Sequence, residues 1–312
     1  MINNFLKIAL FTVTWLAAFP HATAQETPDY SDFGGIIYMD SLVVTASRTG
    51  FEVKDFMEMV QTDSSFLEAF INIRFLEYRS DNDIRFFNKK KKQVARLKNT
   101  IQQNMEGNCR TMDVLEQEIT GNYYKRKKKR RYLTAKMYED IFFTYERTCI
   151  NLNSGNPPGS TSAMQEKIKD LKQLIFQPGS KVDVPIVGKK AQIFDEPLRP
   201  YYDYAISSKK YKTGADCYVF SVKWKEDLKK SDRHKTIIKS LETYFDKNTF
   251  AVVARNYELY YQGTMVDFDV DITIELTKVG EQYVPEFLYL EGDWDVPFRK
   301  KEKVWFETRF YY

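Results

Sequence analysis

In the stretch 264–280, TMVDFDVDITIELTKVG, the eleven residues 266–276 alternate apolar and polar side chains without an exception. Its apolar positions are Val266, Phe268, Val270, Ile272, Ile274 and Leu276, and its polar positions are Asp267, Asp269, Asp271, Thr273, Glu275 and Thr277. Successive side chains of a strand point to opposite faces, so a period of two gives one apolar and one wet face. The stretch therefore predicts a β-strand that buries one face of a sheet.

The three aspartates of this stretch raise the question of a metal site. A calcium loop that began at Asp267 would need glycine at its sixth position and glutamate at its twelfth, where Ile272 and Lys278 stand. Along a strand, alternate carboxylates lie about 7 Å apart, too far to share one ion without ligands from elsewhere. We expect no metal here, and a stripe of acids that faces solvent or a ligand.

The rest of the C-terminal third predicts more strands of the same kind. The candidates are 216–225, 235–245, 249–261, 264–278, 282–291 and 302–312. Earlier in the chain, 36–48 predicts a strand, and 73–103 predicts three strands joined by turns at SDND and NKKK. Because the connections are short, the strands pair as an antiparallel meander.

Helical spacing of apolar residues occurs at four places. The predicted helices are 52–60, 64–72, 134–143 and the amphipathic stretch 160–179, STSAMQEKIKDLKQLIFQPG. These helices interrupt the run of hairpins that an outer-membrane barrel would need, and several strands are too charged to face lipid. The expected fold class is α+β: a large curved antiparallel sheet, in the form of an incomplete barrel, with a few helices packed on one face.

The first 24 residues have the features of a secretory signal peptide. One lysine precedes an apolar run, and Ala22-Thr23-Ala24 offers a cleavage site. We expect an exported protein of the periplasm or the outer-membrane periphery. Residues 25–312 are expected to form a single domain, with 104–160 as an inserted lobe. The formal net charge is only +4, and with export this excludes nucleic acid as a partner.

Export also determines what the three cysteines can do. In an oxidising compartment two of them tend to pair, and we favour Cys109 with Cys149 because both lie in the irregular middle of the chain. Such a bridge would close a loop of about 40 residues. Cys217 opens the apolar run CYVFSVKW, where it is expected to pack as a small buried side chain.

The sequence offers little catalytic machinery. After the signal peptide a single histidine remains, His234, and no nucleophile elbow, P-loop or dinucleotide-binding glycine motif occurs. The string EGDWDVP supplies Glu291, Asp293 and Asp295 beside Trp294, the residue types that a glycosidase uses. Acidic turns beside tryptophan are common, so we expect no catalytic residue, no cofactor and no enzyme activity, and keep a carboxylate-dependent hydrolase as a minor alternative.

A run of seven cations stands out between 125 and 131. It consists of Lys125, Arg126, Lys127, Lys128, Lys129, Arg130 and Arg131. A solvated loop is the plain interpretation. The functional alternative is contact with anionic lipid head groups or lipopolysaccharide phosphates at the outer-membrane surface, because basic clusters are attracted to such surfaces.

The order of elements resembles a known family. Early helices, a long antiparallel sheet after them and an exported chain are similar to the carriers that sort lipoproteins to the outer membrane. The stretch 243–312, which begins TYFDKNTF and ends RFYY, also resembles the end of uncharacterised exported proteins from Gram-negative envelopes. The carrier resemblance implies an incomplete barrel that is capped by helices and holds acyl chains between them.

On that basis we expect a non-enzymatic protein that binds an acyl chain, a lipid or a lipid-modified protein in a groove between sheet and helices. The candidate wall residues are Phe268, Val270, Ile272, Ile274, Phe287 and Tyr289 from the sheet, and Phe66, Phe70, Ile168 and Leu171 from the helices. Whether they line an open groove or a filled core is left open. The alternative function is an envelope assembly or scaffold protein that acts through protein contacts. The oligomeric state is not indicated.

Overall fold

The computed structural model describes residues 37–39, 52–144, 146–149, 189–212, 214–263, 267–295 and 299–312. The predicted signal peptide and the predicted helix at 160–179 lie outside the described residues. In the described part of the chain, no helix combines the length and the apolar character that crossing a bilayer requires.

The described chain forms one 12-stranded sheet whose neighbouring strands are all antiparallel. The strands are β1 (Ile37–Met39), β2 (Tyr78–Phe87), β3 (Gln93–Glu106), β4 (Cys109–Gly121), β5 (Thr148–Cys149), β6 (Tyr202–Lys210), β7 (Asp216–Trp224), β8 (Ile238–Asp246), β9 (Val252–Gln262), β10 (Asp267–Val279), β11 (Gln282–Asp295) and β12 (Glu302–Tyr311). Their order runs from β1 and β6 through β12 to β2, β3, β4 and β5, so the sheet is open. The predicted α+β class with a large antiparallel sheet is confirmed.

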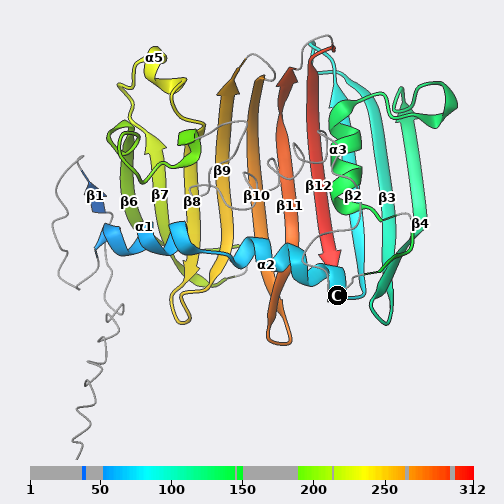
Figure 1. Cartoon of the computed structure of the whole chain (residues 1–312), viewed down its shortest axis with the longest axis horizontal. Helices are drawn as coiled ribbons and strands as arrows, with labels where there is room; N and C mark the ends of the chain where they lie inside the picture. Colours follow the sequence, from blue (N-terminus) through cyan, green and yellow to red (C-terminus); the bar gives the residue numbers. More distant parts are fainter. Residues whose placement is uncertain are drawn as a thin grey trace, which may run out of the picture.

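Three helices lie against one face of this sheet: α1 (Val53–Thr62), α2 (Ser65–Asn72) and α3 (Leu133–Phe142) (Figure 1). The short α5 (Lys230–Arg233) lies in the connection between β7 and β8, and the 3-10 turns are η1 (Ile73–Phe75), η2 (Arg126–Lys128), η3 (Lys189–Ala191) and η4 (Arg199–Tyr201). Figure 1 shows α1 and α2 crossing the strands, and α3 running along β2 and β12. We call the face that contacts these three helices the covered face, and the opposite one the open face.

Buried apolar side chains fill the covered face. Phe56 of α1 stacks on Phe220 of β7 with ring centroids 5.9 Å apart, and Tyr138 of α3 packs on Phe306 of β12. A single cluster of buried residues extends from β6 through the middle strands to β3. Burial of this layer is the main source of stability, because apolar area removed from water gains roughly 25 cal/mol per Å².

Two predictions about the strands need correction. The SDND segment at 80–83 is no turn, because β2 runs through it as one strand with alternate residues buried. Ser80 and Asn82 face the covered side, and Asp81 and Asp83 face the open side. The strand β6 was not predicted at all. The six predicted strands after residue 214 correspond to β7–β12.

The interval 104–160, expected as an inserted lobe, begins inside the sheet. β3 runs to Glu106, and β4 pairs with it along its whole length from Cys109 to Gly121. The helix α3 then packs on the covered face, and the two-residue β5 returns to pair with the start of β4. The described part of this interval therefore belongs to the sheet and its covering layer.

Candidate functional site

The four predicted wall residues of β10 lie on the covered face. Phe268, Val270, Ile272 and Ile274 are all buried, whereas Asp269 and Asp271 between them are exposed. The alternation seen in the sequence is thus the alternation of the two faces, and the aspartates stand on the open one. No group of described acids, histidines or cysteines is arranged to hold a metal ion.

Phe287 and Tyr289 are not part of that wall. A register shift between Glu275 and Leu276 leaves Glu286 as an extra residue on β11, so Phe287 pairs with Glu275 and Tyr289 with Thr273. Cross-strand partners share a face, which places both rings on the open face. There Phe287 lies beneath the guanidinium of Arg309. In this part of β11 the covered-face residues are Leu288 and Leu290, the partners of Ile274 and Ile272.

The helix α2 supplies the other described part of the wall. Phe66 and Phe70 are buried between the helix and the sheet, as predicted, with Phe66 only 1% exposed. The remaining candidates, Ile168 and Leu171, lie outside the described residues. The described wall is therefore β10 with the inner side of α2.

A buried arginine beneath α2 was missed by the sequence analysis. Arg255 of β9 is 1% exposed and its guanidinium carbon lies 4.7 Å from the ring centroid of Phe66. It pairs at 3.0 Å with Asp63, one of the two residues between α1 and α2. Its Nε donates to the hydroxyl of Thr243, and its Nη1 has no partner among the described groups. Burial lowers the pKa of Arg255, although the Asp63 charge opposes this. The sequence does contain a sign of this arginine: in VVARNYELYY, Arg255 takes one of the alternate positions that Val253, Tyr257 and Leu259 otherwise fill.

A second polar group lies under α3. Tyr138 and Thr308 share a hydrogen bond of 2.5 Å, and the hydroxyl of Thr308 donates to Oδ1 of Asn82 at 2.8 Å. The cross-strand neighbour of Asn82 is Asn99, which is 2% exposed and whose side-chain amide has no partner among the described groups. These amides and hydroxyls interrupt the apolar layer at β2 and β3.

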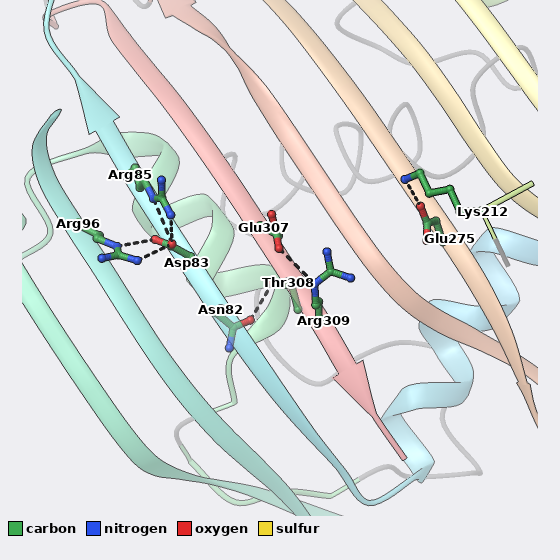
Figure 2. Close-up of polar contacts among 9 residues, drawn as sticks. All are labelled: Asn82, Asp83, Arg85, Arg96, Lys212, Glu275, Glu307, Thr308 and Arg309. Atoms are coloured by element: carbon green, nitrogen blue, oxygen red, sulfur yellow. Dashed lines mark hydrogen bonds and ion pairs between the residues drawn. The ribbon is translucent and has the colours of Figure 1, made fainter. Parts of the chain in front are cut away.

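The open face carries a network of ion pairs (Figure 2). Asp83 accepts hydrogen bonds from Arg85 and from Arg96. Burial opposes the ionisation of Asp83, but these hydrogen bonds outweigh it and lower its pKa. Figure 2 also shows Lys212 on Glu275, at 2.7 Å, and Arg309 beside Glu307. The charges on this part of the face are thus largely matched within the chain.

Two shallow hollows lie on the open face near β10, with volumes of about 450 and 560 Å³. They share Lys239, Glu258 and Asp271 as lining residues. The ammonium of Lys239 lies 3.1 Å from carboxylates of both Glu258 and Asp269. The pKa of Asp271 is raised, mainly by burial and next by the negative charge of the nearby Glu258. This surface has mixed charge and no arrangement of nucleophile and base.

The acidic string at 291–295 does not form the arrangement that a glycosidase needs. Trp294 is buried on the covered face opposite Phe268, whereas Asp293 and Asp295 face the open side. Asp293 forms ion pairs with Lys301 at 2.9 Å and with Lys303 at 2.6 Å. The aromatic ring and the carboxylates thus lie on opposite sides of the sheet.

The basic run follows β4 and includes the turn η2. Six of its members with described side chains are exposed, but Arg130 is also bound to Glu139 of α3, with its Nε 2.7 Å from the carboxylate. Glu139 is 2% exposed and also accepts the hydroxyl of Tyr123 at 3.0 Å. Arg130 therefore anchors this loop to α3 and is not available to a surface in the way that the sequence suggested.

The cysteines behave as predicted. Cys109 and Cys149 form a disulfide that joins β4 to β5 across 40 residues of sequence. Cys217 is buried on β7 without a disulfide partner among the described residues, and burial raises the pKa of its thiol to about 11.

Comparison with known proteins gives matches among solved structures alone, since no family model and no curated protein matches the chain. A DUF1329 family protein from Desulfovibrio piger is 12% identical, with a TM-score of 0.24 over 83% of this chain and 88% of that one. An outer membrane lipoprotein-sorting protein domain from Vibrio parahaemolyticus is 8% identical, with a TM-score of 0.25 over 83% and 90%. A LolA superfamily protein from Nitrosomonas europaea is 9% identical, with a TM-score of 0.22 over 80% and 90%.

Proposed function

We propose that this protein is a non-enzymatic protein of the cell envelope that binds an acyl chain, a lipid or a lipid-modified partner between its sheet and its helices. The supporting observation is that the apolar side of the sheet is wider than the cover that the described helices give it. On β4, Val114 and Ile119 point to the covered side, as partners of Ile101 and Leu97, yet they are 42% and 37% exposed. The apolar layer therefore reaches solvent at this edge.

The attachment of the helices fits an exchangeable ligand. The polar contacts between the α1–α2 pair and the rest of the chain include Arg255 with Asp63, Gln61 with Asp195 and Asn72 with the carbonyl of Tyr283. Most of the remaining contact is apolar and not directional. An acyl chain that replaced side-chain contacts in this layer would gain about 0.8 kcal/mol per methylene removed from water. The predicted signal peptide would bring the protein to a compartment that is bounded by lipid.

The direct test is native mass spectrometry on the protein recovered from its own envelope. We expect adducts with the mass of a lipid or an acylated peptide, which disappear after extraction with organic solvent. Recovery of the bare chain alone, together with no binding of a fluorescent acyl probe, would contradict the proposal.

A pair of variants on α2 makes this test specific. Phe70→Ala should change the affinity of the fluorescent acyl probe, because Phe70 belongs to the inner side of the helix. Glu68→Ala is the matched control, since Glu68 lies on the same helix, is exposed and is not part of its apolar surface. Equal affinities for the two variants would place the probe elsewhere.

A scaffold function is the second candidate, and the edge of the sheet favours it. Only Cys109 and Arg110 of β4 pair with β5, so among the described residues the outer edge of 111–121 has no partner strand. Leu115, the extra residue of a bulge on this edge, is 55% exposed. Unpaired edges accept strands from other chains. A photo-crosslinking amino acid at Leu115 should then give one discrete adduct in the envelope, and a diffuse pattern would speak against it.

A further inference from the structure

A patch of exposed apolar side chains occurs at the end of the sheet where α2 ends. Leu67, Ile71 and Phe75 follow one another at intervals of four along α2 and η1, and are 37%, 43% and 42% exposed. Their spacing places them together on the exposed flank of the helix, next to the side that buries Phe66 and Phe70. An apolar surface that continues from the buried side of a helix onto its water-facing side is unusual and indicates a contact partner.

Two arginines stand beside this patch. Arg74 lies in η1 directly before Phe75, and Arg110 lies on the covered side of β4 next to the disulfide. Neither forms an ion pair with a carboxylate among the described residues, and the Nε of Arg110 is buried without a partner. Burial lowers the pKa of Arg110, and the nearby charge of Arg74 lowers it further. Two neighbouring cations that lack a carboxylate partner in the described part of the chain contrast with the matched pairs of the open face.

The arginines and the apolar patch are fixed relative to each other. The side-chain amide of Gln103, on β3, donates to the carbonyls of Ile73 and Leu76 at 2.7 and 2.8 Å, which ties η1 to the sheet. The last residue, Tyr312, is 41% exposed at the same end, packs on Tyr78 and donates its hydroxyl to Pro285. A tyrosine with an apolar ring and a polar tip suits the boundary between lipid and water.

We propose that this end of the molecule, formed by Leu67, Ile71, Phe75, Arg74, Arg110 and Tyr312, docks on the surface of a membrane that contains anionic lipid. The apolar side chains would enter the head-group boundary, and the two arginines would meet lipid phosphates with their bidentate donors. Charge complementarity selects this occupant, because a second copy would bring like-charged arginines together. The proposal does not depend on a ligand in the covered face.

The patch lies at the opposite end of β4 from the basic run. Arg110 is the second residue of the strand and Lys125 follows its end, and Gly121 lies 11 positions beyond Arg110, a distance of roughly 36 Å at 3.3 Å per residue. The two cationic regions can therefore be changed separately. This makes the run at 125–131 a matched control for charge.

The experiment measures co-sedimentation of the full chain recovered after export with vesicles of phosphatidylglycerol and phosphatidylcholine, and with vesicles of phosphatidylcholine alone. We expect binding to the anionic vesicles that weakens at high salt. The Arg74→Glu/Arg110→Glu variant should bind at least about tenfold more weakly. Ile71→Ser/Phe75→Ser should weaken binding at every salt concentration, while Lys127→Glu/Lys129→Glu should bind like the wild type. Circular dichroism confirms that each variant is folded.

Several results would overturn the proposal. Equal binding to neutral vesicles, or no loss in the Arg74→Glu/Arg110→Glu variant, would remove the role of the arginines. A loss confined to the variant of the basic run would assign the membrane contact to the other end. Release from the vesicles by dilute inorganic phosphate would indicate a site for the free ion, and a dimer abolished by Ile71→Ser/Phe75→Ser would indicate a second copy on the patch. A chain without bound lipid in native mass spectrometry would leave this test unaffected.

Discussion

At the scale of single residues, the buried pair of Arg255 and Asp63 should behave as one unit. Asp63→Ala leaves the guanidinium of Arg255 in an apolar layer with Thr243 as its remaining partner. We expect a loss of about 3–5 kcal/mol in the free energy of unfolding, because removing one member of a buried pair strands the other charge. The measurement is urea unfolding followed by circular dichroism.

The double variant Asp63→Ala/Arg255→Met is the control. Methionine fills a similar volume without a charge, so the double variant should be more stable than Asp63→Ala alone. Asp63 also accepts a hydrogen bond from the amide of Ser65 at the start of α2, so the rescue should be incomplete. A double variant less stable than Asp63→Ala would show that the charge of Arg255 is not what costs stability.

Two acids of the open face should respond to pH in opposite directions. Burial and the Glu258 charge raise the pKa of Asp271, so the folded protein holds a proton there more tightly than the unfolded chain. The contribution of Asp271 to the free energy of unfolding therefore falls as pH rises above about 4. Asp271→Asn should therefore be more stable than the wild type at neutral pH, and the difference should vanish on acidification. Urea unfolding at a series of pH values measures it.

Asp293 provides the matched comparison on the next strand. Burial alone would raise its pKa, but hydrogen bonds from Lys303 and Lys301 outweigh burial and lower it. A lowered pKa contributes stability above about pH 4 that is lost as pH falls through the folded value. Asp293→Asn should thus be less stable than the wild type at neutral pH. The same sign for both variants would contradict this account of the open face.

At the scale of elements, α3 depends on a cap from a distant strand. The carboxylate of Glu302, at the start of β12, accepts the backbone amides of Leu133 and Thr134 at 2.8 and 3.0 Å and the hydroxyl of Thr134 at 2.7 Å. Glu302→Ala leaves these donors at the helix start without a partner, and should cost about 1–2 kcal/mol. Thermal unfolding measures the loss. Glu307→Ala on the same strand should cost much less, because Glu307 pairs with a half-exposed arginine.

The same scale shows where sequence patterns succeed. The β10 strand was predictable because its own side chains alternate between the two faces from Phe268 to Ile274, and the helices α1 and α2 because their apolar residues recur at helical spacing. The strand β2 was not predictable as one strand, because Ser80 and Asn82 are of types that favour turns, yet both are buried in the strand. Their burial depends on Tyr138 and Thr308, which lie far away in sequence. A local pattern contains no information about such partners.

The candidate site was predicted in part for a related reason. The β10 wall and the inner side of α2 follow directly from periodicity. Phe287 and Tyr289 were assigned to the wrong face because the extra residue Glu286 changes the phase of β11, and a bulge leaves no sign in the alternation of one strand. Arg74 and Arg110 were invisible as a pair, since a turn after α2 and the start of β4 meet only in the folded chain.

At the scale of the whole molecule, the C-terminal strand holds the two halves of the sheet together. β12 pairs with β11 on one side and with β2 on the other, so the last residues of the chain join the meander β6–β11 to the N-terminal hairpins. The helices α1 and α2 precede β2 in sequence, yet they lie across strands that follow much later (Figure 1). Long-range pairing of this kind favours cooperative unfolding of the described sheet and slow folding.

The disulfide joins β5 to β4 at the edge of this sheet. Its removal tests whether the stability of the fold depends on an oxidising compartment. Beyond β4 the described sheet contains only the two residues of β5, which the bridge between Cys109 and Cys149 ties to the start of β4. Reduction releases a loop of 40 residues, and the chain-entropy model gives a loss of about 4 kcal/mol. In urea unfolding, dithiothreitol should lower the midpoint of the wild type and of Cys217→Ser. It should leave Cys109→Ser/Cys149→Ser, which is already destabilised, unchanged. An unaltered wild-type midpoint would mean that the edge is stable without its covalent link, and that the fold does not depend on an oxidising compartment.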